Sequence, residues 1–338
     1  MSSVGKVVHV MSSIGRLIET LSKCLPNVHF IDIPTNNVVV NNGTVEIPTE
    51  CIKQLKDAEI LIVDSPIFPG SVAQSLPLLK WVQSTYAGVD GIINSLDISK
   101  PYPSCVLTRL SGKLGPPMAE NIVGQILQHE LKTLHLWEAQ KRKEWVSFPD
   151  RRLLRDLTIG IIGMGDIGRD VAEVCKKGFG MNVWGLVRHI PKKEDQSPNV
   201  DVYKVSSDLP DLLKSCDVIC SILPSTTATR DLFSGNTLEV CKSKCPLFIN
   251  VGRGDVMSEE SVLNALRQKW ISAAVLDVFV SEPLPKDSPL WTEPNVIITP
   301  HVSGVTTDEM LVDIFVDNYQ RYVDNKPLKY TLQWEHGY

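Results

Sequence analysis

Three polar residues in separate loops could together reduce a carbonyl group. They are Arg253, Glu282 and His301. Hydride addition builds negative charge on the carbonyl oxygen and requires a proton, which a histidine with a near-neutral pKa can supply. A glutamate could hold the other ring nitrogen, and an arginine could bind a substrate carboxylate and polarise the carbonyl. Each residue alone is as readily structural or solvated, so the fold must bring the three together.

A glycine motif precedes these residues in the chain. Gly163, Gly165 and Gly168 form the pattern G-x-G-x-x-G between the apolar run Leu157–Ile162 and a helical stretch, Ile167–Lys177. In a dinucleotide-binding fold the first glycine permits a tight turn, the second lets the diphosphate approach and the third allows close helix–strand packing. A glycine turn without a ligand is the alternative. The motif predicts cofactor contacts from Gly163, Met164, Gly165, Asp166, Ile167 and Gly168.

The residue after the next strand indicates which dinucleotide is bound. NAD enzymes usually place a carboxylate about 20 residues beyond the glycines, where it bonds the ribose 2′-hydroxyl. This chain has Arg188, 20 residues after Gly168, followed by His189, Lys192 and Lys193. A guanidinium pairs with a 2′-phosphate that a carboxylate would repel, so NADP(H) is expected and NAD is less favoured. An ordinary solvated basic loop is the alternative.

A loop of small residues, Ser84–Gly91, follows an apolar run in the first third of the chain. Backbone amides in such a loop could receive a carboxylate. A simple strand-ending turn explains the local sequence equally well.

The elements that must position these loops alternate between strand-like apolar runs and helical stretches, which predicts an α/β architecture with parallel sheets. In such sheets ligands bind beyond the carboxyl ends of the strands. An amphipathic segment from about Pro116 to Trp137 separates two series of strands, and a helix over roughly Thr306–Tyr322 closes the chain. The expected strands are Lys6–Val10, Val28–Ile31, Ile60–Asp64, Leu79–Ser84, Val106–Thr108, Leu157–Ile162, Met181–Val187, Val218–Ser221, Leu247–Asn250, Ser272–Leu276 and Val296–Thr299, with a helix over Ile14–Cys24.

The composition limits the class of protein. The chain has 338 residues, enough for about two domains, with 43% apolar and 22% charged residues. A net charge of −5 gives no basic field for nucleic acid, and no apolar run approaches the roughly 18–20 residues that span a membrane. Residues Met1–Val10 lack a signal-peptide pattern, so a cytoplasmic protein is expected.

Eight cysteines include two pairs at C-x3-C spacing, Cys216 with Cys220 and Cys241 with Cys245. A metal site or a redox pair is one interpretation. No histidine accompanies either pair at zinc-like spacing, so reduced, mostly buried thiols without a metal are expected.

The glycine motif is one of several motifs that occur in a recognisable order over most of the chain. The others are Ala87-Gly88-Val89-Asp90, Met118-Ala119-Glu120, Asn250-Val251-Gly252-Arg253-Gly254, Asp277-Val278-Phe279 with Glu282-Pro283-Leu284-Pro285, and Thr299-Pro300-His301-Val302-Ser303-Gly304. Together they resemble the D-isomer-specific 2-hydroxyacid dehydrogenase family. Within it, Arg109-Leu110 and the stretch from Trp137 through Trp145 are most similar to the glyoxylate/hydroxypyruvate reductases of the A type.

This resemblance implies NADPH-dependent reduction of a small 2-oxo acid to the 2-hydroxy acid, with Arg253, Glu282 and His301 as the catalytic set and His301 as general acid/base. It implies two Rossmann- or flavodoxin-like domains with a cleft between them. A cofactor domain, residues 109–302, is inserted into a discontinuous substrate domain, residues 1–108 and 303–338. Family members usually form homodimers. The implied substrate contacts are Ala87, Gly88, Val89 and Arg253, and the further cofactor contacts are Leu223, Pro224, Val251, Gly252, Asp277 and Gly304.

Other functions on the same fold stay open. Corepressors of this fold use bound dinucleotide to control assembly, but they are NAD-linked, whereas Arg188 favours NADP. Phosphoglycerate dehydrogenase usually prefers NAD, and its long forms carry regulatory domains for which this chain has no room. Formate dehydrogenases of this fold carry Gln where this chain has Glu282, so they fit less well.

Overall fold

The computed structural model describes residues 6–41 and 44–335, and the chain forms two compact units. Unit 1 contains the chain up to Leu114 and again from Thr306, whereas unit 2 runs from Gly115 to Val305. Residues 1–5, part of the segment Met1–Val10 in which no signal peptide is expected, lie outside the described ranges, as do residues 336–338.

The unit boundaries differ by a few residues from the domain boundaries that the sequence predicts, 108/109 and 302/303. Arg109 and Leu110 stay with unit 1 because of the hydrogen bonds that their backbone amides make. They donate to the carbonyl oxygens of Tyr330 and Tyr86, at 3.2 and 3.1 Å.

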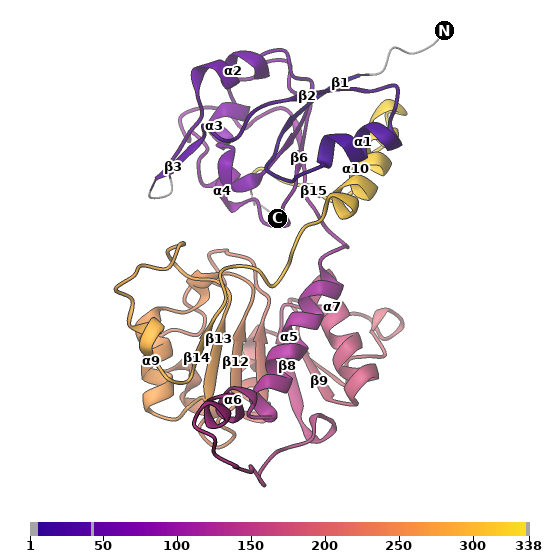
Figure 1. Cartoon of the computed structure of the whole chain (residues 1–338). Coiled ribbons are helices and arrows are strands. Elements are labelled where there is room, and N and C mark those ends of the chain that lie inside the picture. Colours follow the sequence, from indigo (N-terminus) through magenta and orange to yellow (C-terminus); the bar gives the residue numbers. More distant parts are fainter. Residues whose placement is uncertain (1–5, 42–43, 336–338) are drawn as a thin grey trace. The chain divides into compact units, whose positions relative to one another are not determined.

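Unit 1 contains a six-stranded sheet in the order β15-β7-β6-β5-β1-β2 (Figure 1). The strands β2, β1, β5, β6 and β7 are parallel to their neighbours, and β15 runs antiparallel to β7. The parallel strands have the order of a flavodoxin-like sheet. The strands are β1 Val7–Met11, β2 His29–Asp32, β5 Ile60–Val63, β6 Trp81–Ser84, β7 Val106–Thr108 and β15 Thr331–Leu332.

The helices of unit 1 come from both ends of the chain. α1 (Leu17–Cys24) packs against α10 (Asp308–Val323) (Figure 1). Trp81 on β6 stacks on Phe315 of α10 with ring centroids 5.0 Å apart, and burial of these large rings ties the C-terminal helix to the N-terminal sheet. The unit also contains elements that are not among those expected above: α2 Thr49–Leu55, α3 Gly70–Ala73, α4 Asp90–Ile93 and a hairpin of β3 Val39–Asn41 and β4 Thr44–Glu46.

Unit 2 contains a seven-stranded parallel sheet in the order β10-β9-β8-β11-β12-β13-β14. The chain moves outward on one side of β8 and returns to β11 on the other side, so the strand order reverses there. This is the doubly wound Rossmann arrangement, in which ligands bind at the reversal. The strands are β8 Thr158–Ile162, β9 Asn182–Leu186, β10 Val202–Lys204, β11 Val218–Ser221, β12 Leu247–Asn250, β13 Ala273–Leu276 and β14 Val296–Ile298.

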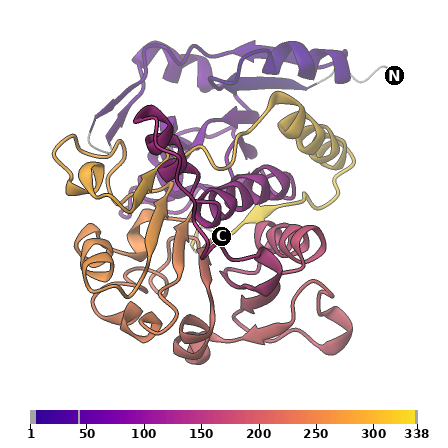
Figure 2. The same cartoon turned by 60° about the horizontal axis from the view of Figure 1, so that its bottom comes forward.

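Helices cover both faces of this sheet. Gly160 and Ile161 are neighbours on β8 and therefore point to opposite faces. A Cβ on Gly160 would meet Leu212 of α8 at 2.6 Å, whereas a Cβ on Gly168 of α7 would meet Ile161 at 3.4 Å. α7 also lies beside α5 (Figure 1, Figure 2). The helices are α5 Gly115–Glu130, α6 Thr133–Lys141, α7 Asp166–Glu173, α8 Leu209–Ser215 and α9 Glu259–Arg267.

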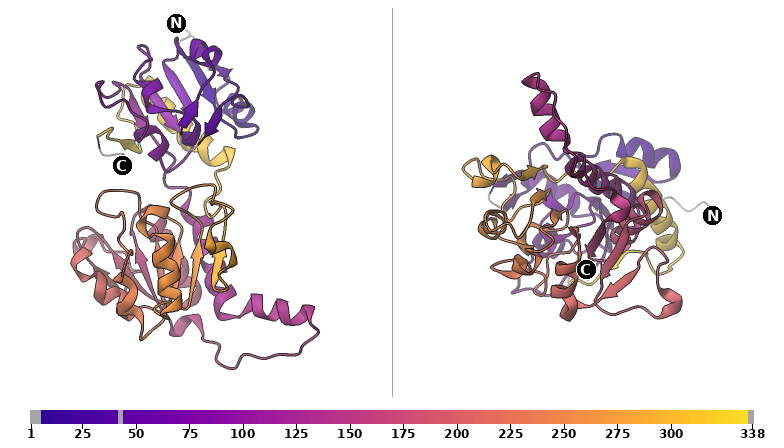
Figure 3. Two further views of the ribbon diagram at one scale, coloured as in Figure 1. Left: turned by 90° about the vertical axis from the view of Figure 1, so that its left-hand side faces the viewer. Right: turned by 90° about the horizontal axis from the view of Figure 1, so that it is seen from below.

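The amphipathic segment expected from about Pro116 to Trp137 is two helices rather than one. α5 ends at Glu130 and α6 begins at Thr133. Lys132 between them adopts a positive φ of 54°, which interrupts the helical hydrogen-bond ladder. α6 and the loop after it extend away from the sheet of unit 2 (Figure 3).

The eight cysteines form no disulfide, and Cys216, Cys220 and Cys241 are buried. Burial raises the pKa of the Cys216 thiol to about 12, so it stays protonated near neutral pH. No helix in the described ranges is long and apolar enough to cross a membrane.

Candidate active site

The predicted cofactor and catalytic residues of unit 2 all follow strands of its parallel sheet. Parallel strands end at the same edge, so these residues gather at what we call the carboxyl edge of unit 2. The glycine motif follows β8, and Arg188 and His189 follow β9; Leu223 and Pro224 follow β11; Val251, Gly252 and Arg253 follow β12; Asp277 and Glu282 follow β13; His301 and Gly304 follow β14.

The glycine motif has the geometry that a bound diphosphate requires. Gly163 adopts a φ of 112°, which favours glycine, and an added Cβ would lie 2.7 Å from the carbonyl oxygen of Ile222. A Cβ on Gly168 would lie 2.3 Å from the carbonyl oxygen of Gly163, so helix and turn pack without room for a side chain. Among the described atoms, nothing approaches the Cβ position of Gly165 within 4 Å. This open space beside the N-terminus of α7 fits a diphosphate held by backbone amides.

The loop that carries Arg253 is fixed by backbone contacts. Asn250, at the end of β12, donates from Nδ2 to the carbonyl oxygen of Arg253 at 2.9 Å and accepts the amide of Gly252 at 3.2 Å. A Cβ on Gly252 would lie 2.5 Å from the carbonyl oxygen of Leu223. The loops after β11 and β12 therefore pack backbone against backbone, which limits the positions open to Arg253.

Asp277 organises the loop that carries His301. Its carboxylate is fully buried and accepts the amides of Val302 and Ser303, at 2.9 and 3.0 Å, and the hydroxyl of Thr299. Its backbone carbonyl accepts the amide of His301 at 2.9 Å. The resemblance implies a cofactor contact for Asp277, and in the structure both of its carboxylate oxygens also hold this loop.

His301 and Glu282 form a hydrogen-bonded pair. His301 Nδ1 lies 2.8 Å from Glu282 Oε2, and Glu282 Oε1 accepts the amide of Phe279 at 2.9 Å. The side chain of His301 is 51% exposed within the chain, so its ring is accessible to a reacting molecule. The carboxylate anchors one ring nitrogen and leaves Nε2 for proton transfer.

The two groups shift each other's pKa. The hydrogen bond to Glu282, helped by its charge, raises the pKa of His301 above its usual value, against opposing effects of burial and Arg253. Burial acts to raise the pKa of Glu282, but hydrogen bonds from His301 and Phe279, with the charges of His301 and Arg253, leave it lowered. An imidazolium beside a carboxylate is therefore favoured, which is the protonation state of a general acid.

In unit 1 the small-residue loop follows β6. The hydroxyl of Ser84 accepts the amide of Tyr86 at 3.1 Å. The next three amides, of Ala87, Gly88 and Val89, donate no hydrogen bond to any described residue. Unpaired amides in succession at the end of a strand could receive a carboxylate.

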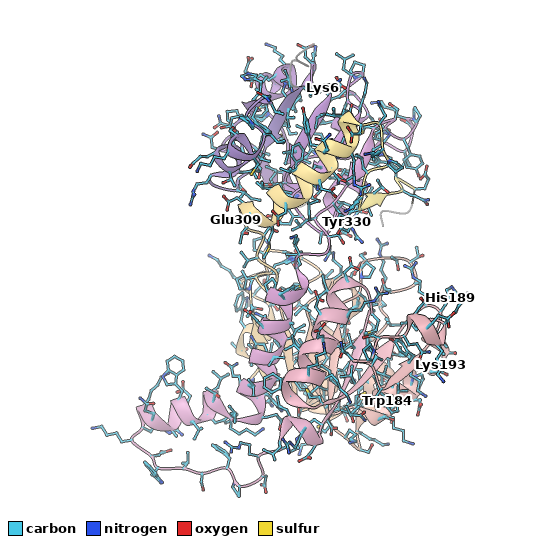
Figure 4. All side chains as sticks on the ribbon, turned by 90° about the vertical axis from the view of Figure 1, so that its right-hand side faces the viewer. Lys6, Trp184, His189, Lys193, Glu309 and Tyr330 are labelled. Carbon is cyan, nitrogen blue, oxygen red and sulfur yellow. The ribbon has the colours of Figure 1, made fainter. Side chains whose placement is uncertain are left out.

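The basic residues expected to select NADP follow β9, the strand next to β8 and its glycine motif. Arg188, His189, Lys192 and Lys193 are exposed. Figure 4 shows His189 and Lys193 near each other at the surface of unit 2. A cluster of cations beside the dinucleotide-binding turn would attract an additional phosphate.

A doubly wound parallel sheet, a glycine turn that fits a diphosphate, and an imidazole–carboxylate pair at the same edge define a nucleotide-linked oxidoreductase. A family model described as "D-isomer specific 2-hydroxyacid dehydrogenase, NAD binding domain" matches residues 123–303. The chain belongs to the D-isomer specific 2-hydroxyacid dehydrogenase family, which confirms the prediction from the order of the motifs.

Relatives within this family carry reductase names. The chain is 32% identical over 265 residues to glyoxylate/hydroxypyruvate reductase A of Klebsiella pneumoniae, covering 77% of this chain and 82% of that one. It is 30% identical over 297 residues to glyoxylate/hydroxypyruvate reductase B of Citrobacter koseri, covering 85% and 88%. The A and B types therefore match at similar identity.

A solved structure shares the whole fold. It is the NADPH-dependent glyoxylate/hydroxypyruvate reductase of Sinorhizobium meliloti in complex with NADP and sulfate. It matches with a TM-score of 0.82 at 26% identity, over 99% of this chain and 100% of that one. The predicted α/β fold with parallel sheets is confirmed.

Proposed function

We propose that the protein reduces a small 2-oxo acid, such as glyoxylate or hydroxypyruvate, to the 2-hydroxy acid with NADPH. The observation that carries this proposal is the 2.8 Å contact between His301 and Glu282 at the edge that also holds Arg253 and the glycine motif. The names of the relatives support the same substrates.

The reaction adds a hydride and a proton across the substrate's C=O bond. Bound NADPH supplies the hydride to the carbonyl carbon. His301 donates its proton to the carbonyl oxygen and, being about half exposed, regains a proton from water. Glu282 holds Nδ1 and favours the imidazolium before transfer, and Arg253 stabilises the negative charge that develops on oxygen.

The two units have different roles in this proposal. Unit 2 binds the dinucleotide and supplies Arg253, Glu282 and His301. Unit 1 binds the substrate carboxylate through the amides of Ala87, Gly88 and Val89, whose hydrogen-bonding capacity is unused within the described residues. In a chain of net charge −5, such local donors are needed to hold an anionic substrate.

Arg188 and its basic neighbours make NADP the preferred cofactor in this proposal. They follow the strand next to the glycine motif, where the ribose 2′ position of a dinucleotide lies in Rossmann folds. The solved relative that binds NADP supports this choice.

The deciding experiment measures oxidation of NADPH and of NADH with glyoxylate, hydroxypyruvate, pyruvate and phenylpyruvate. Fast NADPH-linked turnover of glyoxylate or hydroxypyruvate is expected. Turnover restricted to pyruvate or phenylpyruvate would contradict the proposed substrate class. Dinucleotide binding without turnover of any of the four would instead favour a dinucleotide-sensing scaffold.

We also propose that the protein forms a homodimer through the segment Leu131–Leu153, which we call the arm. The arm contains α6 and extends away from the sheet of unit 2 (Figure 3). Trp137 is 58% exposed and Trp145 is fully exposed, an arrangement that favours burial against a partner. The arm has six basic and three acidic residues in a chain of net charge −5, so a second copy of this chain offers it an attractive surface. Further exposed apolar side chains of the arm are Leu131, Leu134, Leu136, Val146, Phe148 and Leu153.

Light scattering coupled to gel filtration tests the dimer. The expected mass is twice 37.5 kDa for the natural chain and 37.5 kDa for the double variant Trp137→Ser, Trp145→Ser. Leu78→Ser, at an exposed leucine of unit 1, is the matched control and should stay dimeric. A monomeric natural chain would reject the proposal.

A further inference from the structure

A buried carboxylate lies beneath the small-residue loop of unit 1. Asp64 directly follows β5 and is 2% exposed. Its Oδ1 accepts the hydroxyls of Ser12 and Thr85, each at 2.6 Å. Its Oδ2 accepts both the amide and the hydroxyl of Ser13, each at 2.7 Å. Four short hydrogen bonds from two other loops therefore meet on one side chain.

The sheet order explains why Asp64 can join these loops. β5 lies between β1 and β6, and all three strands are parallel. The residues that follow them therefore meet at one edge, with Asp64 in the middle. Hydrogen bonds to a charged acceptor are stronger than neutral ones, and a buried carboxylate requires them. A neutral side chain could not bind all four donors as well.

The hydrogen bonds of Thr85 connect Asp64 to the proposed substrate amides. The amide of Thr85 donates to the carbonyl oxygen of Val63 at 2.9 Å, and its hydroxyl donates to Asp64. The carbonyl of the next residue, Tyr86, accepts the amide of Leu110 at 3.1 Å. The chain is thus held at two successive residues immediately before the unpaired amides of Ala87–Val89 begin.

We infer that Asp64 is a positioning residue for substrate binding. Through Thr85, it holds the amides of Ala87, Gly88 and Val89 in the arrangement that receives the substrate carboxylate. This inference rests on the proposed function, because it names the residue that preorganises the substrate site of unit 1. Asp64 itself does not contact the substrate.

The variant Asp64→Asn tests the inference. The amide keeps the size of the side chain but has one acceptor oxygen instead of two, so two of the four hydrogen bonds lose their acceptor. Because carboxylate binding contributes equally to the ground and transition states, we expect the KM for the oxo acid to rise about tenfold while kcat stays near the natural value. The KM for NADPH, which binds unit 2, should not change.

Three further variants separate positioning from simple stability. Asp217→Asn alters a buried carboxylate of unit 2 and should lower the unfolding midpoint without raising the KM for the oxo acid. Thr85→Val removes a single donor to Asp64, and Thr85→Ser restores its hydroxyl. Thr85→Val should raise the KM and Thr85→Ser should recover it, which keeps the test decisive even if Asp64→Asn fails to fold.

Hydrogen–deuterium exchange distinguishes failure of this inference from failure of the proposed function. Faster exchange at the hydrogen-bonded amides of Thr85, Tyr86 and Leu110 in the Thr85→Val variant would support positioning even in a chain that turns over none of the oxo acids. Unchanged KM and unchanged exchange at these residues in the Thr85→Val variant would overturn the inference, whatever the effect on the unfolding midpoint.

Discussion

The two edges of the unit 2 sheet each carry a contact between a basic side chain and a carboxylate, but the environments of the two pairs differ. At the carboxyl edge, His301 and Glu282 are 2.8 Å apart and their side chains are 51% and 36% exposed. At the opposite edge, Glu130 is buried and accepts two hydrogen bonds from Arg152, at 2.5 and 3.0 Å. Arg152 also donates to Asp217 at 3.2 Å.

Exposure to solvent sets whether such a pair mainly stabilises the fold or exchanges protons. Glu130 immediately precedes the arm and Arg152 lies near its end, so their contact closes the base of the arm. Removing Arg152 would leave the buried carboxylate of Glu130 without this partner, whereas removing Glu130 leaves a partly exposed Arg152 that keeps its bond to Asp217. The exposed pair contributes less to stability but can exchange a proton with a substrate and with water. Variants at the two edges should therefore affect stability and chemistry separately.

The largest effect is expected for His301→Ala. Loss of the general acid should lower kcat about 10²- to 10⁴-fold, while NADPH binding and the unfolding midpoint stay near the natural values. Steady-state kinetics, dinucleotide titration and thermal unfolding measure the three quantities. His135→Ala, at an exposed histidine of the arm, is the control and should retain turnover. Natural turnover in the His301 variant would remove this residue from the mechanism.

The next largest effect is expected for Glu130→Ala at the opposite edge. The free energy of unfolding should decrease by about 2 kcal/mol. This decrease is smaller than for a fully buried pair because Arg152 is partly exposed. The kcat of the folded enzyme should not change. Denaturant unfolding and kinetics on the same preparation test this. Glu138→Ala removes an exposed partner of Lys141 and should leave the midpoint unchanged. A drop in kcat with unchanged stability would reverse the roles assigned to the two edges.

A change in pH dependence is expected for Glu282→Gln. The carboxylate raises the pKa of His301, so the natural imidazolium persists to a higher pH and reduction declines only above that raised pKa. Without the charge, the pKa of His301 should fall, and the declining limb of kcat/KM for reduction should move to lower pH. Any stability that His301 gains from the pair is present at low pH and is likewise lost as pH rises through the raised pKa. Glu260→Gln, at an exposed residue of α9, should leave the profile in place. An unshifted limb in the Glu282 variant would show that another group controls it.

The smallest effect is expected for Arg188→Ala, which lies at the carboxyl edge but outside the proton-transfer pair. Loss of one charge-assisted contact to a 2′-phosphate should raise the KM for NADPH about tenfold. NADH is the internal control, because it lacks that phosphate and its KM should change little. An equal loss for both cofactors would reject a role in selecting NADP.

The sequence predicts which loops carry functional residues better than it predicts the long-range hydrogen bonds that hold those loops in place. The glycine turn, Arg188 and the residues Arg253, Glu282 and His301 are recognisable because each follows an apolar strand or belongs to a short motif. Asp64 is recognisable only as the last residue of a predicted strand. Its role depends on donors 51 and 52 residues earlier and 21 residues later, which no local pattern indicates. The same holds for the contacts of Asp277 with the loop that carries His301.

The interruption at Lys132 was equally hidden, because apolar residues continue at helical spacing on both sides of it. The sequence predicts one amphipathic segment there, whereas a single left-handed residue turns the chain outward into the arm. The positive φ of a lysine has no signature comparable to that of glycine. The prediction also missed the three-residue strand β10 and the hairpin of β3 and β4, although an Asn-Gly pair between runs of β-branched residues is a hairpin signal.

The α/β alternation, the glycine turn and the types of reacting groups follow from the sequence alone, since apolar runs, small residues and charged side chains act over a few positions. The order of the strands, and with it which loops meet, follows from the tertiary structure. Glu282 and His301 come together because β13 and β14 are parallel neighbours, and Asp64 meets Ser12, Ser13 and Thr85 because β5 lies between β1 and β6. Strand order follows from packing between distant segments, whose free energy is a property of the whole unit.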